Sequence, residues 1–74
     1  MKLSEVLSDT NMRRMVEFHN IAREKFGDDL STTTIKRNFK SSYDAIAETK
    51  SGMKFIAKVR EISDRHTSVS WKKA

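Results

Sequence analysis

The sequence contains no cysteine and no proline, and its only glycines are Gly27 and Gly52. Without cysteine, the chain can form neither a disulfide framework nor a cysteine-based zinc site, and this absence agrees with a cytoplasmic location. Two isolated glycines cannot supply a glycine-rich phosphate-binding loop. Composition therefore excludes several common ways in which a short chain is stabilised or binds a nucleotide.

Long apolar runs are also missing, because no stretch of consecutive apolar residues exceeds three. A membrane-spanning helix needs about 20 mainly apolar residues, so we expect no membrane span. The first residues, beginning at Met1 and Lys2, lack the apolar core of a signal peptide. We therefore expect a cytoplasmic protein that does not associate with a membrane.

The chain has 74 residues and a formal net charge of +5. This length predicts one small domain over residues 1–74, mainly helical over 1–43 and mainly β over 44–74. Residues 31–74 contain ten basic and four acidic side chains, so all the excess positive charge lies there. Such asymmetry favours a phosphate backbone or an acidic protein surface as partner. Alternatively, the charge only keeps a small domain in solution.

Apolar residues at helical spacing predict a short helix over residues 3–7 and a second one over 12–26, which Gly27 ends. Capping residues at positions 8–11 favour a break between them, although one continuous helix is the alternative. The expected buried stripe of the second helix consists of Met12, Met15, Val16, His19, Ala22 and Phe26, with Arg14 among the residues on the opposite side.

Residues 30–40 predict a further helix, capped by Ser31 or Thr32 and either ending near residues 41–42 or continuing to residue 47. Ile35 and Phe39 would lie on its buried side, and Lys36, Arg37 and Lys40 would be exposed. A basic helix of this kind has one side for the core and another for a polyanion. This stretch is the strongest functional signal in the sequence.

Beyond residue 50 the apolar period changes from helical to alternating. Met53, Phe55, Ala57 and Val59 alternate with Lys54, Ile56, Lys58 and Arg60, which indicates a half-buried strand. Residues 50–52 form the turn before this strand, residues 63–66 form another turn, and residues 68–71 alternate as a third strand would. A helix over residues 53–65 is the alternative. The expected fold class is α+β, with N-terminal helices and an antiparallel hairpin or three-stranded meander.

The sequence contains no recognisable catalytic site. His19 and His66 lie 47 residues apart, and no metal-binding spacing of histidines or carboxylates occurs. His19 falls in an apolar stripe, where a structural histidine is the usual case. We therefore expect no enzyme activity, no cofactor and no metal.

Residues 30–35, Leu-Ser-Thr-Thr-Thr-Ile, resemble the start of the recognition helix in winged helix-turn-helix regulators of the GntR type. Upstream, residues 21–27 are similar to the preceding helix of that family, which ends in an Ala-x-x-x-Phe-Gly pattern. Downstream, the turn at residues 50–52 occupies the place of the wing. The resemblance covers residues 19–60 and implies a winged-helix-like fold. It also implies that Thr32, Thr33, Lys36 and Arg37 face DNA, while Lys40, Lys50 and Lys54 contact phosphates.

Our leading hypothesis is a small basic protein that binds double-stranded DNA through residues 31–60 and regulates transcription. One copy has a small footprint on DNA, so this hypothesis favours a homodimer. A second hypothesis is a small module that binds and modulates a larger protein, as phage and mobile-element products of this size often do. A third is RNA or ribosome binding through the C-terminal strands, where Lys54, Lys58 and Arg60 share one sheet face.

Overall fold

The computed structural model describes residues 3–63 and 66–74, with side chains from residue 11 onward. One long helix, α1 (Leu3–Phe26), leads through a short 3-10 turn, η1 (Gly27–Asp29), into four strands. The strands are β1 (Leu30–Asn38), β2 (Ser42–Thr49), β3 (Lys54–Ser63) and β4 (His66–Lys73). The break predicted at residues 8–11 is absent, and the alternative of one continuous helix is confirmed.

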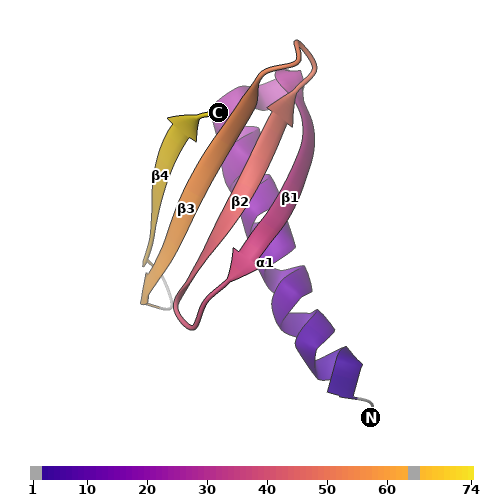
Figure 1. Cartoon of the computed structure of the whole chain (residues 1–74), viewed down its shortest axis with the longest axis vertical. Coiled ribbons are helices and arrows are strands. Elements are labelled where there is room, and N and C mark those ends of the chain that lie inside the picture. The colour runs from indigo at the N-terminus through magenta and orange to yellow at the C-terminus, as the bar shows by residue number, and fades with distance from the viewer. Residues whose placement is uncertain (1–2, 64–65) are drawn as a thin grey trace.

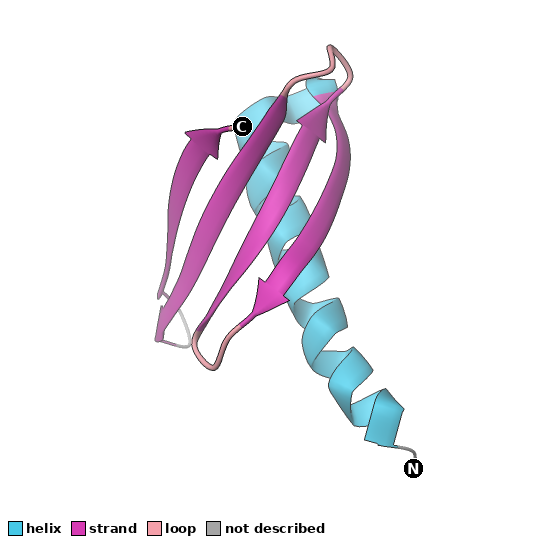
Figure 2. Ribbon diagram, viewed as in Figure 1, coloured by secondary structure: helices cyan, strands magenta, loops and turns pink. Residues whose placement is uncertain are grey.

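The four strands form an antiparallel sheet in the order β1-β2-β3-β4, and α1 crosses one face of it diagonally (Figure 1). The molecule thus has two layers, with one face of the sheet covered by the helix and the other uncovered (Figure 2). The predicted α+β class is confirmed, but the sheet has four strands rather than two or three. No helix in the described part of the chain is long and apolar enough to cross a bilayer.

The core lies between α1 and the two central strands. Its fully buried members are Phe18, Ala22, Tyr43, Ala45, Ala47, Ala57 and Val59. Three of the five core positions on the sheet are alanines, and such small side chains let a helix pack close to the strands. Aromatic rings fill the space beside them, since Phe18 lies 5.7 Å from Trp71 and Phe26 lies 4.9 Å from Phe55 between ring centroids.

The predicted buried stripe of α1 is only partly correct. Ala22 is buried, but Met12, Met15 and Val16 are exposed. The sheet packs against the side of α1 that contains Phe18 and Ala22, where the Phe18 ring fits among the other aromatic residues. At about 100° per residue Met12 and Val16 project more than about 100° around the helix from Phe18, so they face solvent.

The helix predicted over residues 30–40 is wrong, because β1 occupies this stretch. Four consecutive β-branched residues, from Thr32 to Ile35, favour extended backbone. Thr33 and Ile35 alternate toward α1 and pair with Ala47 and Ala45 of β2. Phe39, expected to be buried, lies in the turn after β1 and is 48% exposed. The boundary between helical and β structure therefore lies at residue 30, not near residue 43.

Other predictions from the C-terminal half are confirmed. Residues 54–63 form a strand rather than a helix, and residues 68–71 lie within β4. Gly27 has φ 60° and Gly52 has φ 91°, a backbone region that glycine adopts without steric cost, as expected at a helix end and a turn. The turn predicted at residues 63–66 includes 64 and 65, which lie outside the described residues.

The winged-helix arrangement is not confirmed. A helix-turn-helix needs two packed helices, whereas α1 is the single α-helix among the described residues. Any contact made by residues 31–40 must therefore come from a strand and its turn.

Candidate nucleic-acid interface

The sheet has one uncovered surface, which we call the open face. The alternation of each strand and the pairing register decide which side chains it carries. On β3, Lys54, Ile56, Lys58 and Arg60 point to the open face, while Phe55, Ala57 and Val59 point to α1. The residues of β1, β2 and β4 that pair with these positions point to the same two sides.

Positive side chains dominate the open face. Among the described strand residues, its cations are Arg37 of β1, Lys54, Lys58 and Arg60 of β3 and Lys72 of β4, and all five are exposed. Its carboxylates are Asp44 and Glu48 of β2. Five cations against two carboxylates give this surface a net positive charge, which suits an anionic partner.

The cations lie in rows that cross the strands. Arg37 pairs with Asp44, which pairs with Lys58, so one row joins β1 to β3. In another row Lys54 is opposite Glu48, and their side chains form an exposed ion pair at 3.6 Å. Exposed pairs of this kind contribute less than about 1 kcal/mol, so Lys54 can exchange its partner for a phosphate.

Aliphatic and hydroxyl side chains fill the spaces between the charges. Ile46 and Ile56 pair in the middle of the open face, and Thr34 and Lys72 complete their row. No described aromatic ring of the four strands points to this face, because Tyr43, Phe55 and Trp71 all point toward α1. Phe39 is an exposed ring in the turn after β1, at one end of the sheet. The strands of the open face therefore lack the rings on which single-stranded bases usually stack.

The structure separates the residues predicted to contact nucleic acid. Thr32, Arg37, Lys54, Lys58 and Arg60 lie together on the open face.

The other four predicted residues lie elsewhere. Thr33 points toward the helix side of the sheet. Lys36 lies at the register shift of β1 between Ile35 and Arg37, where the regular pairing with β2 is interrupted. Lys40 and Lys50 lie in the β1–β2 and β2–β3 turns, at opposite ends of the sheet. These positions differ from the prediction because residues 30–38 form a strand and not a helix. In a strand, every second side chain points to the same surface.

Lys72 also lies on the open face, although it is not among the residues that the winged-helix resemblance implied as contacts. The alternation of Ser68, Val69, Ser70 and Trp71 already predicted a strand, and its continuation places Lys72 on the side opposite Trp71. That alternation was the signal that could have found it.

A polar cluster holds the other side of the sheet to α1. Arg14 is 3% exposed, and its guanidinium donates to Asn38 Oδ1 and to Glu61 Oε1, both at 2.8 Å. It also lies 5.1 Å from the centre of the Tyr43 ring. Because its partners come from β1, β2 and β3, this one side chain connects the helix to three strands. Sequence periodicity had placed it on the exposed side of the helix.

Tyr43 completes the cluster. Its hydroxyl donates a 2.6 Å hydrogen bond to Glu17 Oε1. Burial, followed by the hydrogen bond and the charge of Glu17, raises the pKa of Tyr43 well above its ordinary value. The hydroxyl thus stays protonated and acts as a donor within the core.

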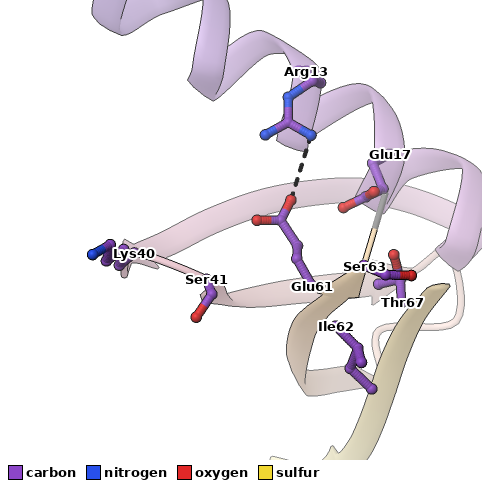
Figure 3. Close-up of a pocket in the computed structure, with 8 residues that line it drawn as sticks. All are labelled: Arg13, Glu17, Lys40, Ser41, Glu61, Ile62, Ser63 and Thr67. Atoms are coloured by element: carbon purple, nitrogen blue, oxygen red, sulfur yellow. Dashed lines mark ion pairs between the residues drawn. The ribbon is translucent and has the colours of Figure 1, made fainter. Parts of the chain in front are cut away.

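A hollow of about 360 Å³ opens beside this cluster (Figure 3). It is lined by Arg13, Glu17, Lys40, Ser41, Glu61, Ile62, Ser63 and Thr67. Glu61 points toward Arg13, and their closest charged atoms are 3.5 Å apart. Since Arg13 already faces a carboxylate, this hollow suits an anion less well than the open face does.

Comparisons with protein-family models, with curated proteins and with solved structures give no match. The described residues contain no cluster of three or more metal-ligating side chains. Any functional conclusion therefore rests on the side chains of this chain and their placement.

Proposed function

We propose that the protein binds double-stranded DNA through the open face of its sheet and acts in transcription regulation. The observation that carries this proposal is the set of five exposed cations that share the open face with two carboxylates, on strands that turn no described aromatic ring to that face. Cations neutralise phosphates along a duplex, whereas single strands are usually held by stacking on aromatic rings.

The dimensions of the sheet agree with a groove contact. Neighbouring strands lie about 4.8 Å apart, so the four strands are about 14 Å wide before side chains are added. The major groove is about 12 Å wide and admits a two-stranded ribbon. The whole sheet is therefore too wide to enter. The central strands lie over the groove, while the outer strands β1 and β4 lie at its edges.

β3 is the strand best suited to enter the groove. It is central, it is the longest strand, and it carries Lys54, Lys58 and Arg60 on the open face. Arg37 on β1 and Lys72 on β4 flank it on either side and would contact the two phosphate backbones. Most of the affinity in this arrangement is electrostatic and independent of base sequence.

A salt titration of binding to duplex DNA tests the proposal. With five phosphate contacts, the logarithm of the binding constant falls with the logarithm of salt concentration at a slope of about −4 to −5. A Lys58→Glu variant should bind about tenfold more weakly, with a slope smaller by about one unit. Arg23→Glu is the matched control, because Arg23 is exposed on α1 and absent from the open face. Equal losses for the two variants would contradict the proposal.

The same titration separates two other functions. Lys54, Lys58 and Arg60 share one sheet face, as the RNA hypothesis requires, and a preference for RNA over duplex DNA in a competition gel would support that function instead. Absence of binding to both nucleic acids, together with a protein partner retained at high salt after nuclease treatment, would favour a protein-binding module.

A further inference from the structure

Two isoleucines lie side by side in the middle of the open face. Ile46 of β2 pairs directly with Ile56 of β3, and Thr34 on β1 and Lys72 on β4 continue the same row across the sheet. Directly opposed residues have Cβ atoms about 5 Å apart, so the two side chains form one apolar spot, which we call the isoleucine pair. Contact across the strands leaves part of this spot accessible, since Ile56 is 41% exposed.

The isoleucine pair differs in chemistry from the side chains around it. Among the described strand residues of the open face, Ile46 and Ile56 are the only large aliphatic ones. Along β3, Lys54 and Lys58 lie two positions from Ile56 on either side, at a spacing of about 7 Å. The two carboxylates that flank Ile46 along β2 are each opposite a cation of β3. The pair is thus an apolar spot enclosed by charged side chains.

The central position of the pair decides which part of a duplex it meets, a step that rests on the proposed function. There the open face lies over the major groove, with β1 and β4 at the groove edges. The row of the isoleucine pair then crosses the groove, so Lys72 at one end and Thr34 at the other are nearest to the two phosphate backbones. Ile46 and Ile56 lie between them and face the edges of the base pairs.

An aliphatic spot over base edges discriminates between base pairs. The 5-methyl group of thymine is the apolar group that standard base pairs present in the major groove, and aliphatic side chains pack against it. Cytosine presents an amino group there instead, and an isoleucine would take water from that donor without replacing the hydrogen bond. Contact with the isoleucine pair therefore favours A·T pairs and disfavours unmodified G·C pairs.

We propose that Ile46 and Ile56 give the protein a preference for duplex DNA that carries a 5-methylpyrimidine, thymine or 5-methylcytosine, under the centre of the open face. The surrounding cations supply most of the affinity, because their phosphate contacts do not depend on base sequence. The isoleucine pair supplies the base preference. Burial of one methyl group against it should raise the affinity about fourfold.

Replacing thymine with deoxyuridine in a short duplex of A·T pairs tests the proposal. The replacement removes the 5-methyl group and leaves the charge and the hydrogen-bonding groups of the base unchanged. Wild-type protein should bind the deoxyuridine duplex about fourfold more weakly for each methyl group lost from the contact. Because that contact is apolar, the ratio of the two affinities should stay constant while salt weakens both. Equal affinities for the two duplexes would overturn the proposal.

Alanine variants show which side chain reads the methyl group. Ile56→Ala should reduce the ratio of thymine to deoxyuridine affinity, and the double variant Ile46→Ala/Ile56→Ala should bring it close to one. Ile62→Ala is the matched control, because Ile62 is 62% exposed on the same strand but lines the hollow beside Arg13. It should keep the wild-type ratio. Urea unfolding checks that each variant is folded. A folded double variant with the wild-type ratio would contradict the assignment.

A duplex of G·C pairs, with cytosine or 5-methylcytosine, separates the two sources of the methyl group. Tighter binding to the methylated duplex would show that the site accepts either base, whereas a methyl effect confined to A·T duplexes would restrict it to thymine. Lys58→Glu should weaken binding to every duplex and leave the ratio unchanged, because it alters a charge and not the apolar contact. Binding without any methyl effect would overturn this inference alone. Absence of binding to every duplex would overturn the proposed function and the inference together.

Discussion

The two faces of the sheet are built from the same strands but have different chemistry. On β3, Val59 is fully buried against α1, while its neighbours Lys58 and Arg60 are exposed on the open face. The helix side holds aromatic rings, alanines and a paired arginine. The open side holds cations that have few carboxylates near them. Substitutions on the first side should therefore change the free energy of unfolding, and those on the second should change binding.

Replacing Arg14 with alanine should have the largest effect on stability. The change leaves Glu61 and Asn38 without their 2.8 Å donors in a mostly buried site, which costs about 3 kcal/mol of unfolding free energy. Thermal or urea unfolding measures it. Arg13→Ala is the control, because Arg13 is 63% exposed and its ion pair contributes less than about 1 kcal/mol. Similar losses for both variants would show that the cluster does not hold α1 to the sheet.

Val59→Ala should have the next largest effect. It leaves a cavity between α1 and the sheet and should cost about 2 kcal/mol in urea unfolding. DNA affinity of the folded variant should be unchanged, since Val59 points away from the open face. A stable Val59→Ala variant with weakened DNA binding would reverse the assignment of the two faces.

Tyr43→Phe should cost about 1 kcal/mol at neutral pH, because it removes the hydrogen bond to Glu17. The pH dependence of the unfolding free energy gives a more specific test of the Tyr43 hydroxyl. The pKa of Tyr43 is raised in the folded protein, so the folded state keeps a proton that the unfolded state releases above about pH 10. Wild-type stability should therefore fall more steeply than that of Tyr43→Phe above pH 10, by about 1.4 kcal/mol per pH unit. Parallel curves from pH 10 to 12 would contradict this protonation state.

Lys58→Ala should have the smallest effect on stability, within about 0.5 kcal/mol, because the side chain is exposed and contacts solvent. Its effect should appear in the salt dependence of DNA binding, as a slope smaller by about one unit. Paired with Val59→Ala, it compares adjacent residues on opposite faces of one strand. Loss of stability without a change in the salt dependence would place Lys58 in the core instead.

Local patterns predicted some parts of this protein well. The alternation of residues 53–60 predicted β3 and already placed Lys54, Lys58 and Arg60 on one face, as the structure has them. Gly27 follows the last residue of α1 and Gly52 lies in the β2–β3 turn, and both have a positive φ, which is a local backbone requirement. These features depend on a few neighbouring residues, so the sequence alone contains the necessary information.

Residues 30–40 show where local patterns are insufficient. Ile35 and Phe39 have helical spacing, while the threonines before them favour a strand. The conflict is resolved by β2, because Thr33 and Ile35 gain backbone hydrogen bonds and side-chain contacts only when β1 pairs with it. Arg14 is a similar case. Its burial needs Asn38 and Glu61, which lie 24 and 47 residues away along the chain.

Local patterns in the sequence were enough to predict the α+β class, a helix that ends just before Gly27, alternating strands and the concentration of positive charge after residue 30. They did not show which side of α1 is buried or which cations share a surface. Both are decided by contacts between segments distant in sequence. A helix with apolar residues around much of its surface can bury different parts of that surface until a sheet packs on one of them. Strand pairing then decides which charged side chains become neighbours.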